Sequence, residues 1–184
     1  VGGVSCGLEE AGMTASVLIE RDSLAAASLR HCHPNATIFA EDINVVLDRI
    51  RKNDPAYVIC KGDDHVWASP PCQGFSSANR NAVPTENDLR NQALSDTFVD
   101  LVDLVKPYTA NMENVTGMMR PKNKHRLQKI IRRLVLSGYD VCLATHNALY
   151  YGDPQSRQRV ILYASRLGVP IELPKRTHTN DKVK

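Results

Sequence analysis

The residues best suited to chemistry lie in a cysteine loop and in a short acidic motif further along the chain. Cys72 stands in the run PPCQGFS at 70–76, where two prolines restrict the backbone before the cysteine and Gly74 relieves crowding after it. A cysteine that only fills a core needs no such rigid mounting, so we interpret Cys72 as a presented, catalytic thiol. Glu113 opens the motif ENV at 113–115, 41 positions beyond the thiol.

A second group of residues is typical of a site for a nucleotide-like ligand. The run VGGVSCGL at 1–8 is a glycine-rich loop that opens a helix and lets the backbone approach a ligand; a plain tight turn would give the same pattern. Glu20 could accept hydrogen bonds from both hydroxyls of a ribose, and Asp42 could accept one from an adenine amino group. Each acid could instead interact with the N-terminus of the helix that follows it.

Short apolar or β-branched runs alternate with helical patterns along the chain, and these elements must position the residues above. The predicted strands cover residues 15–20, 37–40, 65–69, 108–113, 141–147 and 159–164. The predicted helices cover residues 22–31, 43–51, 91–106 and 125–136. This alternation favours an α/β fold with a largely parallel sheet. Ligands of such folds bind at the carboxyl ends of the strands, which is where Glu20, Asp42, the cysteine loop and Glu113 fall.

Composition excludes a low-complexity disordered chain, a collagen and a membrane protein. The 184 residues are 42% hydrophobic and 23% charged, and no apolar run reaches the roughly 18 residues that a membrane-spanning helix needs. Residues 1–121 carry 10 basic and 16 acidic side chains, whereas residues 122–184 carry 13 basic and 4 acidic ones. The basic C-terminal part indicates a polyanion such as nucleic acid as partner. The alternative is a solvated helix face over residues 122–133.

The cysteines indicate a reducing environment. The chain has five, an odd number without the close spacing of a zinc site: Cys6, Cys32, Cys60, Cys72 and Cys142. We therefore expect free thiols, no metal and an intracellular location, which would be the nucleus in a eukaryote and the cytoplasm in a bacterium.

Three motifs together resemble the C5-cytosine DNA methyltransferase family. The family has a cysteine loop of the form PPCQGFS, an acidic strand end ENV and a basic element QxRxR. All three stand here in that order, the last as QSRQR at 155–159. The pattern GGxxxGLxxAG at 2–12 is similar to the end of the family's cofactor loop. The resemblance covers essentially the whole chain.

The resemblance implies a DNA (cytosine-5-)-methyltransferase that uses S-adenosyl-L-methionine and acts on double-stranded DNA. Cys72 would add to C6 of a flipped-out cytosine, and the resulting covalent adduct would make C5 nucleophilic enough to take the methyl group. Glu113 would donate a proton to N3 of the ring, and Arg157 and Arg159 would hold O2, the base and the flanking phosphates. The carbonyl of Pro70 would accept a hydrogen bond from the exocyclic amine.

The other site residues that the resemblance implies divide between cofactor and substrate. The cofactor-binding residues would be Gly2, Gly3, Glu20, Asp42, Ile43, Pro71 and Leu94. The substrate-binding residues, besides Pro70, would be Gln73, Ser76, Asn114 and Gln155.

The implied fold is Rossmann-like, with a doubly wound, mostly parallel sheet of the S-adenosylmethionine-dependent methyltransferase type. The family's first strand should precede Val1, so we expect that strand to be missing from the chain. We expect residues 1–169 to form a partial catalytic domain and residues 170–184 to be a linker toward a target-recognition region that is absent here. The 184 residues alone are therefore expected to be inactive.

Three other functions fit parts of the pattern. An RNA (tRNA) cytosine-5 methyltransferase would have the same fold, although the GFS ending at 74–76 is more similar to the DNA enzymes. A catalytically silent regulatory module would have no chemical need for the intact cysteine, glutamate and two arginines. A cysteine hydrolase would need a histidine base, and no histidine of this chain stands in a comparable motif. Neither a membrane nor a particular protein partner is expected.

Overall fold

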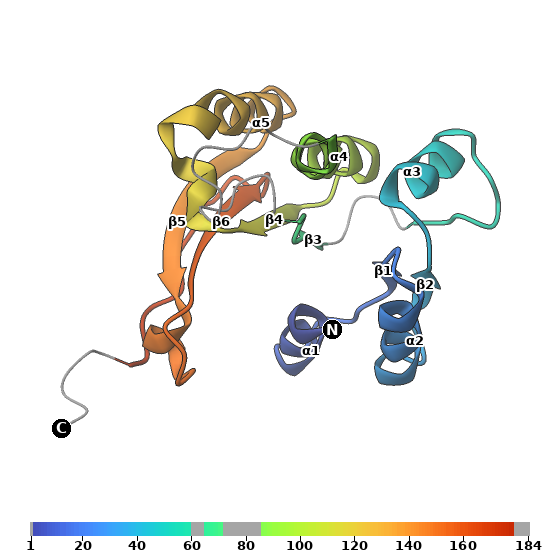
Figure 1. The fold of residues 1–184 in the computed structure, drawn as a ribbon, viewed down its shortest axis with the longest axis horizontal. Coiled ribbons are helices and arrows are strands. Elements are labelled where there is room, and N and C mark those ends of the chain that lie inside the picture. Colours follow the sequence, from blue (N-terminus) through green and yellow to red (C-terminus); the bar gives the residue numbers. More distant parts are fainter. Residues whose placement is uncertain (1, 60–64, 72–85, 179–184) are drawn as a thin grey trace. The chain divides into compact units, whose positions relative to one another are not determined.

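The computed structural model describes residues 2–59, 65–71 and 86–178, without the side chains of residues 87–92. These residues form two compact units, Val1–Ile59 and Cys60–Lys184, each with its own sheet (Figure 1).

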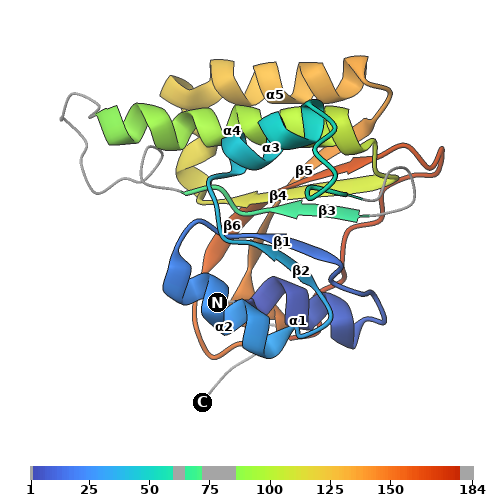
Figure 2. The same ribbon diagram turned by 90° about the vertical axis from the view of Figure 1, so that its right-hand side faces the viewer.

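The first unit is a pair of parallel strands between helices. Strands β1 (Val17–Ile19) and β2 (Thr37–Phe39) pair in parallel, and Figure 2 shows α1 (Gly3–Glu10) and α2 (Ser23–Cys32) on one side of them and α3 (Ile43–Arg51) on the other. Asp22 and Asp42 cap α2 and α3, because each carboxylate accepts a hydrogen bond from a backbone N–H of the first turn. The buried apolar side chains of this unit are Ala26, Leu29, Phe39, Val46, Leu47 and Ile50.

The second unit has a four-stranded sheet in the order β3-β4-β6-β5. The strands are β3 (His65–Ala68), β4 (Thr109–Asn114), β5 (Asp140–Asn147) and β6 (Gln158–Ser165). Strand β3 is parallel to β4, whereas β6 is antiparallel to both β4 and β5. Three of these four strands therefore run in one direction, which confirms the predicted α/β class with a mostly parallel sheet.

The reversed direction of β6 is a feature that the sequence pattern did not predict. Residues 148–157 join β5 to β6 and contain the short helix η3 (Ala148–Tyr151). Parallel neighbours need a crossover of about a dozen residues or more, usually through an α-helix. This connection is too short for that, so the chain returns antiparallel and β6 inserts between β4 and β5.

One face of this sheet carries the hydrophobic core. Helices α4 (Glu86–Val105) and α5 (Lys124–Leu136) cover it (Figure 2), and the short helices η1 (Thr116–Met119) and η2 (Pro121–Asn123) lead into α5. Alternate residues of each strand point to this face. The buried set includes Ala110, Met112, Val160, Leu162 and Ala164 from the strands, and Phe98, Val99, Val102, Leu127, Ile130 and Leu134 from the helices.

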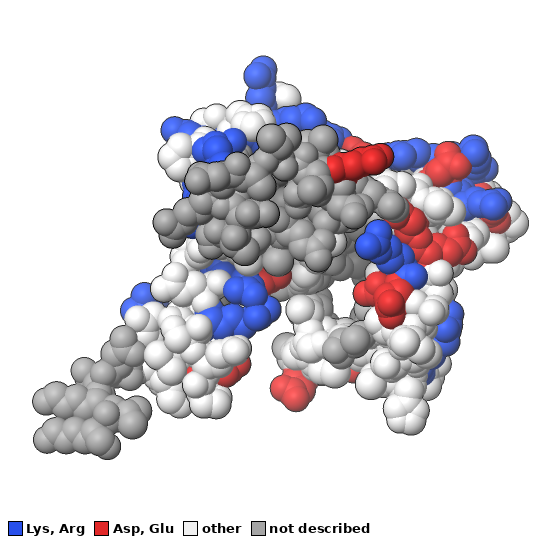
Figure 3. All heavy atoms as spheres, in the orientation of Figure 1, with Lys and Arg blue, Asp and Glu red and all other residues white. Residues whose placement is uncertain are grey.

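The basic residues of α5 are divided between an ion-pair ladder and an exposed surface. The ladder joins Arg126 and Lys129 to Asp96, and Arg133 to Asp100 and Asp103, all on α4. Lys122, Lys124 and Arg132 are exposed. Figure 3 shows Lys and Arg side chains gathered over α5 and over the lower part of the β5–β6 pair. Part of the charge that we attributed to a polyanion partner therefore joins two helices instead.

This ladder predicts unequal effects for two neighbouring arginines. Arg133 Nη2 lies 2.8 Å from a carboxylate oxygen of both Asp100 and Asp103, so Arg133→Gln should lower the free energy of unfolding by about 1 kcal/mol. Arg132→Gln is the matched control and should change it by less than about 0.5 kcal/mol. Urea unfolding measures both, and the difference should shrink in about 1 M NaCl. Equal losses for the two variants would contradict the ladder's role.

Residues 170–178, which the sequence suggests as part of a linker, contact the β5–η3 region. Tyr151 Oη donates to the Pro174 carbonyl at 3.2 Å, and the backbone N–H groups of Thr177 and His178 donate to the Tyr150 carbonyl at 3.1 and 3.0 Å. The guanidinium of Arg176 lies 4.2 Å from the centre of the Tyr150 ring. The domain boundary at residue 169 stays a prediction.

Three further observations concern the described residues alone. Among them, no helix is both long and apolar enough to cross a bilayer, and no three potential ligand side chains gather into a metal site. Cys6, Cys32 and Cys142 are free thiols.

Candidate active site

One edge of the four-stranded sheet brings together Pro70, the acidic motif at 113–115 and the basic element at 155–159. The register pairs Asn114 at the end of β4 with Val160 on β6, and Asn147 at the end of β5 with Gln158 on β6. Because β6 is antiparallel, it begins at the edge where β3, β4 and β5 end. The basic element at 155–159 thus reaches the same edge as the acidic motif, although it opens a strand rather than follows one.

The ion pair between Glu113 and Arg159 is the central contact at this edge. Arg159 Nε lies 2.6 Å from Glu113 Oε1, and the two side chains are 24% and 22% exposed. Arg159 also donates from Nη1 to the Gln158 carbonyl at 2.8 Å. A charge-assisted bond of this length fixes the direction of both side chains while leaving them accessible to a ligand. Two residues predicted to be catalytic are therefore in direct contact.

Asn114 connects the end of β4 to the start of the cysteine loop. Its side chain is buried, with 2% of the residue exposed, and Nδ2 donates to the Pro70 carbonyl at 3.2 Å. Its Oδ1 accepts from the Val115 N–H at 2.9 Å. A carbonyl oxygen has two lone pairs, so Pro70 could accept a second hydrogen bond from a substrate amine. In this structure Asn114 positions Pro70, the residue two before Cys72.

Asn147 is a positioning residue that belongs to the family-like stretch before the basic element but was not predicted as a site residue. Its Oδ1 accepts from the N–H groups of Leu149 and Arg157 at 3.2 and 2.9 Å, and its Nδ2 donates to Ser156 Oγ at 3.1 Å. Asn147 thereby closes the loop that precedes β6 and orients its basic element. The available signal was an asparagine at a strand end, a position where its side chain can hydrogen-bond the backbone of a turn. The side chains of Arg157 and Gln155 are exposed.

The first unit holds five of the seven predicted cofactor residues: Gly2, Gly3, Glu20, Asp42 and Ile43. The segment expected as a glycine-rich loop is helical from Gly3 onward, so among its described residues only Gly2, the N-cap of α1, lies outside the helix. Gly2 has a φ of +81°, and a Cβ at this position would lie 3.2 Å from Leu29 Cδ2, so this position favours glycine. Glu20 and Asp42 follow neighbouring parallel strands and so lie at the same edge of the pair. Glu20 Oε1 accepts from the Asp22 N–H at 2.9 Å, and Asp42 Oδ1 accepts from the Asn44 N–H at 3.0 Å. Both acids thus make the helix N-terminal contacts that we gave as the alternative role.

Of the remaining predicted site residues, the structure describes four and leaves three outside its described range. Ile43 and Leu94 are half-buried on α3 and α4, Gly3 and Pro71 are exposed, and Cys72, Gln73 and Ser76 lie outside the described residues.

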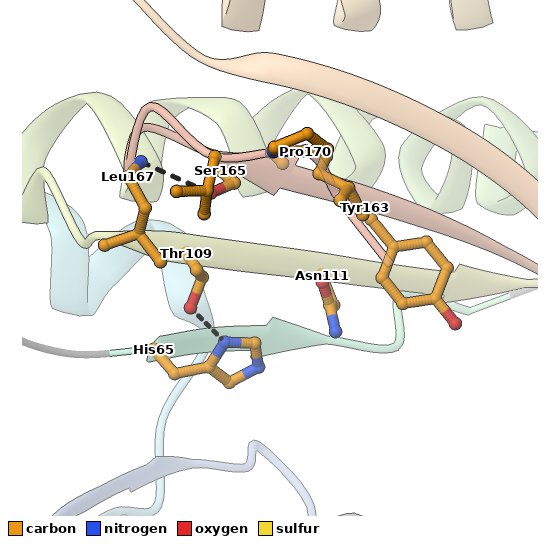
Figure 4. Close-up of a pocket in the computed structure, with 10 residues that line it drawn as sticks. His65, Thr109, Asn111, Tyr163, Ser165, Leu167 and Pro170 are labelled. Carbon is orange, nitrogen blue, oxygen red and sulfur yellow. Dashed lines mark hydrogen bonds between the residues drawn. The ribbon is translucent and has the colours of Figure 1, made fainter. Parts of the chain in front are cut away.

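A pocket of about 280 Å³ lies on the sheet face opposite α4 and α5 (Figure 4). Its polar lining includes His65, Thr109 and Tyr163, and its apolar lining includes Leu167 and Pro170. His65 Nδ1 lies 2.9 Å from Thr109 Oγ1, and burial lowers the pKa of His65. None of the predicted site residues that the structure describes lines this pocket, so it is separate from the edge described above.

Comparison with known proteins decides the family. The family model described as C-5 cytosine-specific DNA methylase matches residues 1–184. The chain belongs to the C-5 cytosine-specific DNA methylase family. Curated relatives agree: the chain is 36% identical over 179 residues to the type II methyltransferase M.DdeI of Desulfomicrobium norvegicum, covering 92% of this chain and 40% of that protein. It is 32% identical to DNA (cytosine-5)-methyltransferase 1 of Gallus gallus, covering 91% of this chain and 11% of that protein.

Solved structures of methyltransferases share the fold. A candidate DNA modification methyltransferase encoded within an E. coli prophage superposes with a TM-score of 0.72 at 26% identity, covering 89% of this chain and 43% of its own. A DNMT2 variant from Spodoptera frugiperda gives a TM-score of 0.67 at 21% identity, covering 97% of this chain and 51% of its own. The predicted Rossmann-like fold of the S-adenosylmethionine-dependent methyltransferase type is thus confirmed. The chain spans about half or less of the length of these family relatives.

Proposed function

We propose that the protein is a DNA (cytosine-5-)-methyltransferase that acts through a covalent bond between Cys72 and the target base. The observation that carries this proposal is that the acidic motif contacts both the basic element and the first residue of the cysteine loop at one sheet edge. Glu113 contacts Arg159 at 2.6 Å, and Asn114 bonds the Pro70 carbonyl two residues before Cys72. Segments more than 40 positions apart in the sequence therefore supply an acid and a cation at the edge where the cysteine loop begins.

The nucleophile starts the reaction in this mechanism. C5 of cytosine is too weak a nucleophile to take a methyl group unaided. When the Cys72 thiolate forms a bond to C6, the electron pair of the C5–C6 double bond shifts into the ring and C5 becomes nucleophilic. After methylation the C5 proton leaves to solvent water, and its electron pair re-forms the C5–C6 double bond as the sulfur–C6 bond breaks. The proton on N3 returns to Glu113, so the aromatic ring and the thiolate are both restored.

Glu113 and Arg159 manage the charge that this addition places on the ring. Once its carboxylate has taken up a proton from solvent, Glu113 delivers that proton to N3, which removes negative charge from the ring as the sulfur–carbon bond forms. Arg159 keeps the Glu113 carboxyl oriented and offers a permanent cation to the neighbouring O2. Arg157, which is exposed, is suited to a phosphate beside the flipped base.

The first unit has a donor set that fits the adenosine part of S-adenosylmethionine. Carboxylates at the ends of two neighbouring parallel strands, Glu20 and Asp42, suit the ribose hydroxyls and the adenine amine. Gly2, which precedes α1, has the left-handed backbone that favours glycine. When bound, S-adenosylmethionine would supply the electrophilic methyl group.

The nucleic-acid substrate is the point that a direct assay must decide. The GFS sequence after Cys72 and the DNA methyltransferase relatives both favour DNA. The same fold could serve an RNA substrate, so tRNA is the second arm of the test.

We expect the full-length protein to transfer radiolabelled methyl groups from S-adenosylmethionine to duplex DNA and not to tRNA. Nuclease digestion of the product should release 5-methyl-2′-deoxycytidine. Label that enters only tRNA would replace the DNA proposal with the RNA one, and label on the exocyclic nitrogen of cytosine would exclude a Cys72–C6 mechanism.

A further inference from the structure

A buried chain of hydrogen bonds lies behind the glycine-rich loop of the first unit. Ser5 Oγ donates to the Gly2 carbonyl at 2.8 Å and lies 2.8 Å from His33 Nε2. His33 Nδ1 lies 2.9 Å from Glu9 Oε1. Only 6% of Ser5 and 3% of His33 is exposed, whereas 40% of the Glu9 side chain is exposed. This series of hydrogen bonds therefore runs from the exposed Glu9 to the backbone of Gly2.

The positions of these residues explain why they meet. Ser5 and Glu9 are four residues apart on α1, so they share one face of the helix. His33 is the C-cap residue of α2, and its own N–H donates to the Leu29 carbonyl at 2.8 Å. His33 thus uses its ring to join the end of α2 to the first turn of α1.

The Gly2 backbone is linked to this histidine through Ser5. The Gly2 carbonyl accepts both the Ser5 hydroxyl and the Cys6 N–H, the latter at 3.0 Å. A Cβ at Gly2 would lie 3.5 Å from His33 Nε2 and 3.4 Å from Ser5 Oγ. Ser5 and His33 therefore stabilise the left-handed conformation of Gly2.

Two of these bonds have a direction set by an acceptor-only partner. The Gly2 carbonyl and the Glu9 carboxylate can only accept, so Ser5 donates its hydroxyl hydrogen to Gly2 and His33 Nδ1 donates to Glu9. The direction between Ser5 Oγ and His33 Nε2 depends on whether Nε2 also carries a hydrogen. Serine, histidine and glutamate are the residue types of a hydrolase triad, but here the buried hydroxyl donates to the backbone and is not free to be activated by the histidine.

We propose that His33 is a positioning residue for S-adenosylmethionine binding. It holds Ser5 and, through Ser5, the Gly2 carbonyl, so that the Gly2–Gly3 backbone is already in its binding conformation before the ligand arrives. Preorganisation of this kind raises affinity because less loop ordering is lost on binding. The inference rests on the proposed function, since it takes the glycine-rich loop as the cofactor loop.

The test is a series of variants in the full-length protein, with S-adenosylmethionine binding measured by calorimetry. His33→Phe keeps a ring of similar size and removes both hydrogen bonds, so its Kd should rise at least about tenfold. Ser5→Ala should act similarly. Glu9→Gln keeps an acceptor oxygen for Nδ1 and should stay within about threefold of the wild type. His31→Phe changes an exposed histidine two positions away on α2 and is the matched control, with no expected change.

Kinetics separate a positioning role from a purely structural one. Positioning predicts a higher KM for S-adenosylmethionine with kcat and the KM for DNA nearly unchanged, whereas a structural role would lower the melting temperature and the active fraction with the Kd of folded protein unchanged. A wild-type Kd for His33→Phe would overturn the inference and leave the proposed function intact. Failure of the wild-type protein itself to bind S-adenosylmethionine would instead overturn the proposed function.

Discussion

Replacing Cys72 by serine should abolish methyl transfer, with a loss of at least about 10⁴-fold in kcat. A serine hydroxyl is a far weaker acid than a thiol and is almost entirely un-ionised near neutral pH. It therefore cannot add to C6 of cytosine at a useful rate. The measurement is single-turnover transfer of labelled methyl groups to duplex DNA in the full-length protein.

Cys32→Ser is the control for the general effect of losing a thiol. Cys32 is exposed and free, and it lies in the first unit at the end of α2, so the control should retain wild-type activity. A Cys72→Ser protein with more than about a tenth of wild-type activity would contradict the role of Cys72 as nucleophile.

Replacing Glu113 by glutamine should slow the chemical step by about 10² to 10⁴-fold and leave the affinity for DNA within about threefold. The amide can still accept a hydrogen bond from Arg159, so the edge should keep its geometry. It cannot deliver a proton to N3, so the loss should appear in kcat. Fluorescence anisotropy with a duplex measures affinity, and rapid-quench kinetics measures the chemical step.

Glu172→Gln provides the matched control, because Glu172 is an exposed glutamate next to Ile171, which lines the separate pocket. This variant should behave as wild type in both assays. If Glu113→Gln lost affinity and rate to the same degree, Glu113 would be a binding or structural residue and not the proton donor.

Local sequence patterns were sufficient to predict most of the elements and the class of fold. The apolar spacing of Ile43, Val46, Leu47 and Ile50 predicts a helix over 43–51, which is the observed extent of α3. The strand direction of β6 could not be predicted in this way, because periodicity does not record which neighbour a strand pairs with. It depends on the length of the connection at 148–157, which rules out a helical crossover.

The sequence predicted the site residues that would take part in the reaction, but not the residues that hold them in position. Glu113 and Arg159 were predicted from motifs, and the structure brings them into contact. Asn147 and His33 act through hydrogen bonds to a loop and to a neighbouring helix, and those partners become visible when the chain is folded. The same holds for Arg133, whose charge suggested nucleic acid but whose partners are two aspartates of α4.

Covalent trapping tests the account most directly. A duplex with 5-fluorocytosine at the target position cannot release the enzyme after methylation, since the fluorine replaces the proton that must leave C5. Incubation of the full-length protein with this duplex and S-adenosylmethionine, followed by proteolysis and mass spectrometry, should place the DNA adduct on the peptide that contains Cys72. An adduct on another cysteine, or methyl transfer to ordinary duplex with no adduct on the fluorinated one, would contradict the account.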